Sequence, residues 1–270
     1  MRKDFDRDYI EEELKNIDGK MEDEVNFYML GGGAMSFRGL KAATKDVDGV
    51  VKTREEFDLL KRALKNSMYG EIEVSEIYQR MKSRQFLQNE EGFRFDLFLR
   101  KIANGLILSD GMVSRAEKKI SLKNLKIFIM SPEDIFVLKS ITSRERDRED
   151  MNILFTQGLD FDVIKEEIIL QSEKSTDKAW ISYFYLGLEE FVDMYGFEIP
   201  YFDEFEELAS REIVRYRVKE LLDDEPMNME KLVEHIGEDE KWIEDILIKM
   251  EEDCEVSLDE NGKIVKNTGK

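Results

Sequence analysis

The fold is decided by residues 26–51, which read NFYMLGGGAMSFRGLKAATKDVDGVV. The apolar run at 26–30 predicts a buried strand, and the three glycines at 31–33 end it abruptly. We expect a short helix from Ala34. A second strand is expected at 45–51, because that segment has the length and the β-branched residues of a strand. The order strand, glycine turn, helix, strand predicts an α/β core.

Two aspartates of this stretch are placed to bind a metal ion. Residues i and i+2 of a strand point to the same face, so Asp46 and Asp48 aim two carboxylates at one spot. A divalent cation relieves their repulsion, and two Mg²⁺ ions about 3.5–4 Å apart stabilise the attacking and leaving oxygens of a phosphoryl displacement. Asp96 is predicted as the third carboxylate, because the alternation in FRFDLF, residues 93–98, separates Arg94 and Asp96 from the apolar face.

Three consecutive glycines, Gly31, Gly32 and Gly33, are predicted to hold phosphates. A glycine turn between a strand and a helix exposes backbone N–H groups and the helix dipole to an anion, with no Cβ to obstruct its approach. Alone, such a turn is usually a structural loop, and an Asp-x-Asp pair is usually a solvated strand end. Together with the later strand that carries an aspartate, both occur in the required order, with 13 residues between Gly32 and Asp46.

The rest of the chain predicts further α/β elements and then helices. Helices are expected at 6–16 and 54–68, strands at 93–99 and 125–130, and a helix from Pro132 with Ser131 as its N-cap. Strand signals then fade, and helical stretches follow at 161–173, 177–195 and 203–222. Two short helices and a hairpin with the turn DENG at 259–262 predict a winged-helix-like module.

These motifs resemble the polymerase β nucleotidyltransferase superfamily, whose core carries hG[GS], then DxD, then a third aspartate on a later strand. Four stretches, LGGGAMSFRG, KDVDGVV, FRFDLF and SPEDIFVLKSITSRERDREDM, resemble an uncharacterised prokaryotic group related to the toxins of type IV abortive-infection systems. The resemblance covers residues 26–156. It implies a nucleotidyltransferase core with a mixed sheet at 1–156, followed by a helical region at 157–222 and the acidic winged-helix-like module at 223–270.

The resemblance also assigns roles to the motif residues. Asp46 and Asp48 would be metal ligands, and Asp96 would be a third ligand or assist deprotonation of the acceptor hydroxyl. The cofactor would be Mg²⁺, two ions, with Mn²⁺ as a substitute. Many members have serine after the first motif glycine, where this chain has glycine, and the change removes a hydroxyl contact to the phosphate.

The helix expected after Pro132 carries further candidates. On one continuous helix, Lys139, Arg146 and Asp150 fall in one stripe with Asp147 beside it. A partly buried lysine supplies a point charge for a triphosphate. The resembling group has a lysine followed by an aspartate here, which Lys139 and Asp147 match with longer spacing. We interpret Lys139, Arg146 and Asp147 as nucleotide-binding, Lys139 also as catalytic, against the alternative of a solvated charged helix.

Charge is distributed unevenly along the chain. Residues 1–156 hold 28 Lys and Arg against 29 Asp and Glu, whereas residues 157–270 hold 13 against 32. An acidic helix meets DNA phosphates poorly, so the winged-helix-like module is expected to contact a protein rather than DNA. Six basic residues predict a rim for a nucleic-acid acceptor, against the alternative of an ordinary mixed surface: Arg80, Lys82, Arg84, Lys118, Lys119 and Lys123.

Other classes of chemistry are excluded or disfavoured. A single cysteine, Cys254, excludes an internal disulfide, and a single histidine, His235, leaves no Cys/His cluster for zinc. The first residues are charged and no run approaches the roughly 18 apolar residues of a membrane span, so we expect a cytoplasmic protein.

The sequence therefore favours an enzyme that transfers a nucleoside monophosphate from an NTP to an acceptor hydroxyl, on tRNA or on a protein. Two alternatives stay open. One is a non-catalytic nucleotide-binding protein that regulates a partner through its acidic C-terminal module. The other is the toxin of a toxin–antitoxin pair.

Overall fold

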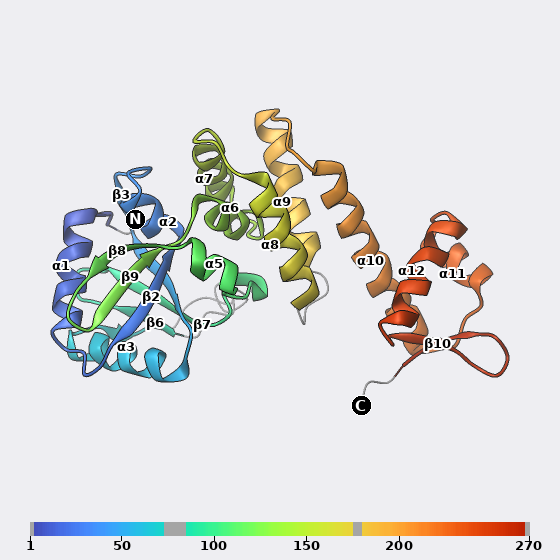
Figure 1. The fold of residues 1–270 in the computed structure, drawn as a ribbon, viewed down its shortest axis with the longest axis horizontal. Coiled ribbons are helices and arrows are strands. Elements are labelled where there is room, and N and C mark those ends of the chain that lie inside the picture. The colour runs from blue at the N-terminus through green and yellow to red at the C-terminus, as the bar shows by residue number, and fades with distance from the viewer. Residues whose placement is uncertain (1–2, 73–84, 175–179, 268–270) are drawn as a thin grey trace. The chain divides into compact units, whose positions relative to one another are not determined.

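The computed structural model describes residues 3–72, 85–174 and 180–267. The chain forms two compact units, Met1–Pro200 and Tyr201–Lys270, which are drawn as a ribbon in Figure 1. The predicted boundaries at 156 and 222 do not coincide with this division. Helices that follow residue 156 pack on the first unit, and the helix expected at 203–222 belongs to the second.

A mixed sheet forms the centre of the first unit. Its strands among the described residues are β2 Val25–Leu30, β4 Asp46–Val51, β5 Gly70–Glu71, β6 Gln85–Gln88, β7 Arg94–Leu99, β8 Glu117–Ser121 and β9 Leu125–Ile129. They lie in the order β5-β6-β7-β4-β2-β9-β8. β4 pairs antiparallel with β2 and parallel with β7, and β2 pairs parallel with β9. The predicted mixed sheet is confirmed.

Two helices from the N-terminal part of the chain pack together beside the sheet. They are α1 Arg7–Asp18 and α3 Arg54–Asn66, which contact each other, and α3 also packs on β2, β4 and β7. α3 begins with a capping box, in which Thr53 and Glu56 accept each other's backbone N–H. Its apolar residues Phe57, Leu60 and Leu64 recur at helical spacing and are all buried. α3 therefore buries its apolar stripe on one face of the sheet, and the aspartates of β4 lie on the opposite face.

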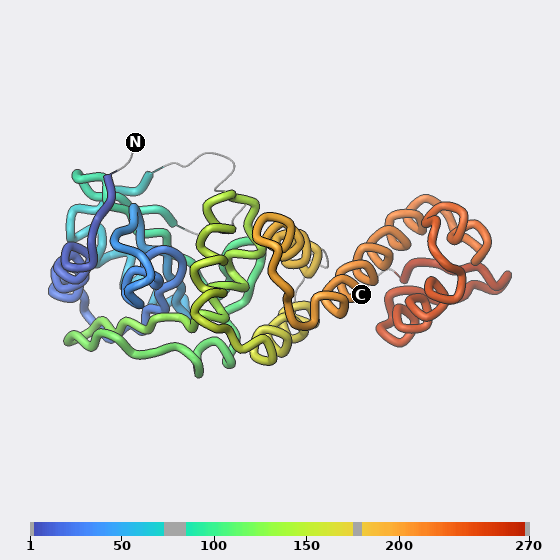
Figure 2. The backbone as a smooth tube through the Cα atoms, turned by 90° about the horizontal axis from the view of Figure 1, so that it is seen from above, coloured from blue at the N-terminus to red at the C-terminus, as the bar shows by residue number. Residues whose placement is uncertain are grey.

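A group of helices lies on the other side of the sheet from α1 in Figures 1 and 2. It contains α6 Pro132–Ser140, α7 Glu145–Phe155, α8 Phe161–Lys174 and α9 Trp180–Tyr195, and α6 contacts the other three. A buried ion-pair network ties it to α5 Asp110–Arg115. Arg115 lies 2.6 Å from both Asp134 on α6 and Glu167 on α8.

The second unit contains α10 Phe202–Asp224, α11 Met229–Ile236 and α12 Glu240–Glu252, followed by the antiparallel pair β10 Val256–Leu258 and β11 Ile264–Lys266. Its core includes Val218, Leu232, Ile243 and Met250. Gly262 closes the hairpin with a φ of +73°, a conformation that glycine adopts without strain. The two helices and the hairpin are where the sequence predicts them, and the winged-helix interpretation stays a prediction.

Two local predictions are wrong. The glycines do not form a turn before the helix, because α2 Gly31–Phe37 begins directly at Gly31. The single helix from Pro132 is instead two helices, α6 and α7, separated by residues 141–144. Arg148 contacts the backbone at this break, since its guanidinium donates to the carbonyl of Lys139, at 2.9 Å, and to the carbonyl of Thr142.

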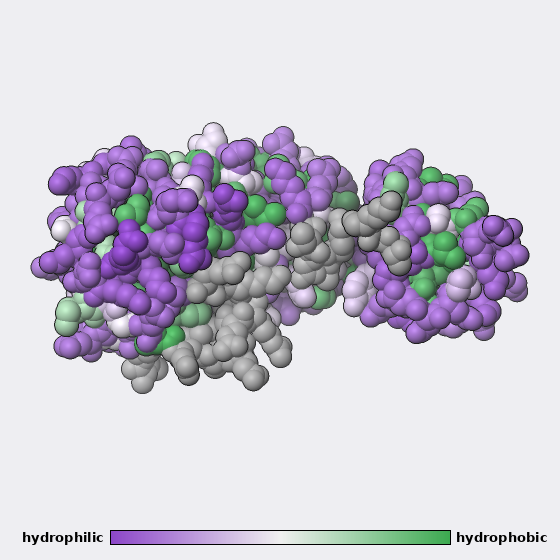
Figure 3. All heavy atoms as spheres, turned by 90° about the horizontal axis from the view of Figure 1, so that it is seen from below, coloured by the Kyte–Doolittle hydropathy of each residue, from purple (hydrophilic) through white to green (hydrophobic). Residues whose placement is uncertain are grey.

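The visible surface of each unit is mainly hydrophilic in Figure 3, as a sequence with 38% charged residues leads one to expect. Among the described residues, no helix combines the length and the apolar character needed to cross a membrane.

Candidate functional site

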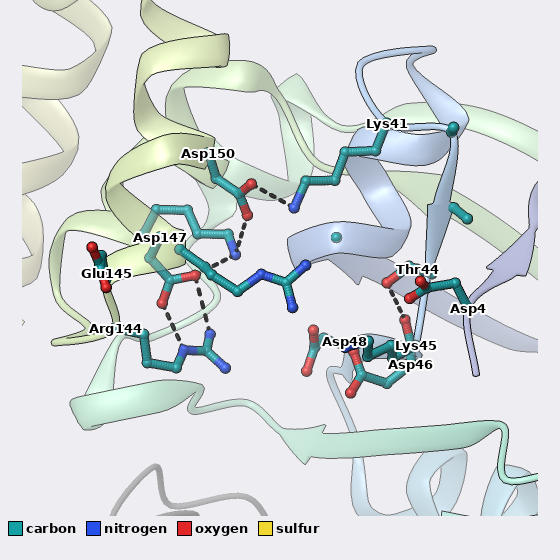
Figure 4. Close-up of a pocket in the computed structure, with 15 residues that line it drawn as sticks. Asp4, Lys41, Thr44, Lys45, Asp46, Asp48, Arg144, Glu145, Asp147 and Asp150 are labelled. Carbon is teal, nitrogen blue, oxygen red and sulfur yellow. Dashed lines mark hydrogen bonds and ion pairs between the residues drawn. The ribbon is translucent and has the colours of Figure 1, made fainter. Parts of the chain in front are cut away.

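An open cavity of about 790 Å³ lies in the first unit, between β4 with the segment that precedes it and the α6–α7 pair (Figure 4). Most of its wall is charged. Its lining residues are Asp4, Gly32, Lys41, Ala42, Ala43, Thr44, Lys45, Asp46, Asp48, Lys139, Arg144, Glu145, Arg146, Asp147 and Asp150. The cavity therefore brings together the aspartates of β4 and the predicted residues of α6 and α7.

The carboxylate wall follows from strand register. β4 and β7 pair in parallel with Asp46 opposite Arg94 and Asp48 opposite Asp96, so all four side chains lie on one face of the sheet. Asp46 and Asp48 line the cavity. The strand periodicity that predicts a shared face for the three aspartates is thus realised.

Arg94 lies between two of these aspartates. Its Nη2 is 2.9 Å from Oδ2 of Asp46, and its Nε is 2.5 Å from Oδ1 of Asp96. The side chains of Arg94 and Asp96 are only 6% and 5% exposed, so this pair is buried beside the cavity. Within the described part of the chain, no group of three or more Asp, Glu, His or Cys side chains is close enough to hold a metal ion.

The crowding of carboxylates shifts their protonation. Burial raises the pKa of Asp48 to about 6, and the charge of Asp46 adds to the shift, while Arg144, Lys139 and Arg94 oppose it. Burial likewise raises the pKa of Asp96 well above its ordinary range, helped by the charge of Asp48. Burial and the neighbouring carboxylates therefore both disfavour the ionised forms of Asp48 and Asp96, and a positive charge nearby would favour them.

The three glycines have different surroundings. Gly31 has a φ of +59°, and a Cβ there would lie 2.5 Å from Oδ2 of Asp48, so glycine lets the aspartate pack against the start of α2. Gly32 lines the cavity, whereas Gly33 is buried against Met29. Of the three, Gly32 is the one whose backbone can face a ligand in the cavity.

The opposite wall is built from α6 and α7. Nζ of Lys139 lies 2.6 Å from Oδ1 of Asp147 and 2.8 Å from Oδ2 of Asp150. Lys41, from the segment before β4, also pairs with Asp150, and Arg144 lies 2.7 Å from Oδ2 of Asp147 (Figure 4). The neighbouring aspartates outweigh burial and raise the pKa of Lys139, so the ammonium stays charged.

Several lining residues escaped the sequence reasoning. Lys41 and Thr44 lie in the segment that the sequence left without an element, Lys45 is the first residue of the strand expected at 45–51, and Arg144 lies in the break between α6 and α7. A short pairing of β1 Phe5–Asp6 with β3 Ala43–Thr44 shapes this edge, and the Thr44 hydroxyl donates to the carbonyl of Asp46 at 3.0 Å. A signal was present, since Lys-x-x-Thr-Lys immediately precedes the Asp-x-Asp pair.

The remaining site predictions have mixed outcomes. Arg146 lines the cavity, as does Asp147. Lys118 and Lys119 lie on β8 and Lys123 follows it, and these three residues do not line the cavity. Three further residues of the predicted basic rim fall outside the described residues: Arg80, Lys82 and Arg84.

The fold and site define a protein of the nucleotidyltransferase class, with a mixed sheet whose Asp-x-Asp strand follows a glycine-rich helix start and opens onto a charged cavity. The chain belongs to the family described as nucleotidyltransferase of unknown function (DUF6036), whose match covers residues 8–194. The match includes β4, α6 and α7, which build most of the cavity, and it excludes Asp4, β1 and the second unit. A comparison with curated proteins gives no match. The relation to abortive-infection toxins stays a prediction.

Proposed function

We propose that this protein is a Mg²⁺-dependent nucleotidyltransferase that moves a nucleoside monophosphate from an NTP to an acceptor hydroxyl. The acceptor oxygen forms a bond to the α-phosphorus, the bond from that phosphorus to the bridging oxygen breaks, and pyrophosphate and the hydroxyl proton leave. The observation that carries the proposal is the cavity, which sets the carboxylates of Asp46 and Asp48 opposite a wall that carries Lys139, Arg144 and Arg146. Family membership supports the same class of reaction.

The donor set of the cavity fits Mg²⁺. This ion prefers carboxylate oxygens, and it is commonly held by one or two carboxylates with the remaining positions filled by substrate phosphates and water. Asp46 and Asp48 supply such a pair, and a cation bound between them would favour the ionised form of Asp48, whose pKa burial raises. Bound there, Mg²⁺ would polarise the phosphoryl oxygens and stabilise the developing charge. Mn²⁺ accepts the same oxygen ligands.

The chain's own residues would bind and orient the nucleotide. Five cationic residues line the cavity and would attract the triphosphate: Lys41, Lys45, Lys139, Arg144 and Arg146. Gly32 offers backbone close to the ligand without a Cβ. Asp96 is engaged by Arg94, so in this arrangement it would support Asp46 through the shared guanidinium.

A direct assay tests the proposal. Purified protein is incubated with each NTP, Mg²⁺ and candidate acceptors, total tRNA or protein, and the release of pyrophosphate is measured. We expect release by the wild type and loss of at least about a hundredfold in Asp46→Asn with Asp48→Asn, because both metal-binding oxygens are altered. Asp58→Asn, an exposed aspartate on α3, is the matched control. Unchanged release in the double variant contradicts the proposal.

One observation favours a second candidate function, a nucleotide-binding protein without turnover. Arg94 already pairs with Asp46 and Asp96, and the described carboxylates do not converge on a point that could hold a metal through three side chains. In that case the protein would bind NTP and release no pyrophosphate with any acceptor. It would then act on a partner, for which the acidic second unit is the natural contact.

The toxin hypothesis is tested separately. If the protein modifies tRNA or another component of translation, its expression should arrest growth, and Asp46→Asn should abolish the arrest. Arrest that persists in this variant would show that toxicity does not depend on the proposed site.

A further inference from the structure

Five charged side chains of alternating sign run along the α6–α7 wall of the cavity. In order they are Lys41, Asp150, Lys139, Asp147 and Arg144, and each pairs with the next. We call this arrangement the charge chain. Its three cations and two aspartates leave one net positive charge, and its two ends are both cations.

The middle of the charge chain is buried, and its members are paired with one another. The Lys139 side chain is 7% exposed, and those of Asp147 and Asp150 are 3% and 4% exposed. Lys139 is the member that pairs with both aspartates, so two of its three ammonium donors are engaged. A phosphate that drew Lys139 away would leave buried carboxylates without that partner, which is costly.

The ends of the charge chain are accessible. The side chain of Arg144 is 48% exposed and that of Lys41 is 22% exposed, against 7% for Lys139. Both line the cavity. Arg144 also lies close enough to Asp48 for its charge to lower the pKa of that carboxyl, so this end faces the carboxylate wall.

We propose that the phosphates of the nucleotide contact Lys41 and Arg144, and that Lys139 is a positioning residue that acts through them. The inference rests on the proposed function, because it assumes that the cavity takes a nucleoside triphosphate. Lys139 fixes Asp150 and Asp147, Asp150 fixes the ammonium of Lys41, and Asp147 fixes the guanidinium of Arg144. The result is two cations held apart at set positions, a match for a polyphosphate rather than a single phosphate.

Nucleotide binding tests the ends of the charge chain. Isothermal titration in Mg²⁺ gives the Kd of an NTP and the Kd of the matching nucleoside monophosphate. The Kd of the monophosphate divided by the Kd of the NTP, called the ratio below, measures phosphate recognition independently of turnover. We expect Lys41→Gln and Arg144→Gln each to weaken NTP binding about tenfold to a hundredfold, the usual effect of losing a charge-assisted hydrogen bond, and to lower the ratio. Lys15→Gln, an exposed lysine on α1, makes the same charge change outside the cavity and should alter neither value.

A double-mutant cycle tests the role of Lys139. Lys139→Gln should lower the ratio in the wild-type background, because the ends lose their fixed positions. In the background of Lys41→Gln with Arg144→Gln it should change the ratio by less than about twofold, since coupled residues are not additive. An equal loss in both backgrounds would mean that Lys139 itself contacts phosphate, and the proposal would be overturned.

A charge-balanced variant tests the role of Lys139 without leaving an extra buried charge that could cause misfolding. Lys139→Met with Asp150→Asn removes one charge of each sign and leaves Asp147 paired with Arg144. It should fold, as judged by circular dichroism, and should lower the ratio by about as much as Lys41→Gln, which an unchanged ratio would contradict. A wild type that binds no NTP refutes the proposed function itself. A wild type that binds NTP, with end variants that behave like Lys15→Gln, refutes this inference alone.

Discussion

Replacing Asp48 by asparagine should remove metal binding and at the same time stabilise the metal-free protein. The side chain keeps its size but loses its charge. In the folded chain, burial of the Asp48 carboxyl and the negative charge of Asp46 raise the pKa of Asp48 from 3.8 to about 6. Its ionisation therefore opposes folding.

The size of the stabilisation expected for Asp48→Asn follows from the shift in the pKa of Asp48. A rise of about 2 pKa units corresponds to about 3 kcal/mol of unfavourable free energy once the group is ionised, at 1.36 kcal/mol per unit. The folded state binds this proton more tightly than the unfolded state, so stability falls as pH rises from about 4 to about 6. Asp48→Asn should be about 3 kcal/mol more stable than the wild type at pH 7 and equal to it at pH 4.

Fluorescence can isolate the unit that contains Asp48. The two tryptophans lie in different units, and Trp180 is buried in the first, so a Trp242→Phe background leaves a single reporter of that unit. Urea unfolding is followed in EDTA at pH 4, 5, 6 and 7. Asp58→Asn on the exposed surface of α3 controls for the loss of one carboxylate.

Two results would refute this reasoning. The first is a urea unfolding midpoint for Asp48→Asn at pH 7 that is no higher than the midpoint for Asp58→Asn. The second is a gain that is the same at pH 4 and pH 7, because a gain from removed ionisation must vanish where the carboxyl is protonated. Adding Mg²⁺ should then raise the midpoint of the wild type more than that of Asp48→Asn, since only the former keeps both ligands.

Two further predictions use the same fluorescence signal. Gly187→Ala should destabilise the first unit by about 2 kcal/mol or more, because its Cβ would lie 1.8 Å from the carbonyl oxygen of Ser140. Gly70→Ala, whose Cβ would meet nothing closer than 4.0 Å, should not, and equal effects would contradict the close packing of α9 on α6. Ser131→Ala should cost about 1 kcal/mol, because the hydroxyl accepts the N–H of Asp134 as the N-cap of α6, and no change in midpoint would argue against that cap.

Local patterns predicted the strands that carry the aspartates. β2 and β4 are within one residue of the expected ranges. A short apolar run and a β-branched run each indicate a buried strand without reference to any other part of the chain. The shared face of Asp46 and Asp48 follows from the strand period alone. Their register with β7 does not, since it depends on a parallel pairing between segments that are far apart in the sequence.

The salt bridges around Asp96 lay beyond what a single sequence reveals. Alternation in β7 separated Arg94 and Asp96 from the apolar residues, which is correct. The pattern does not tell whether two charged neighbours on one face both serve a ligand or neutralise each other. In the structure Arg94 takes up the charge of Asp96 and part of that of Asp46, so the predicted metal triad is reduced to the pair Asp46 and Asp48 in the cavity.

The break between α6 and α7 is what assembles the cationic wall. On a continuous helix with a rise of about 1.5 Å per residue, Asp147 and Asp150 would be displaced from Lys139 by about 12 Å and 16 Å along the axis. A lysine side chain could not pair with both. Residues 141–144 turn the chain back, and Arg148 donates to the carbonyls of Lys139 in α6 and Thr142 in the turn. Both aspartates then lie within 3 Å of one ammonium. The sequence prediction missed this turn because residues 141–144 hold no glycine or proline to mark it.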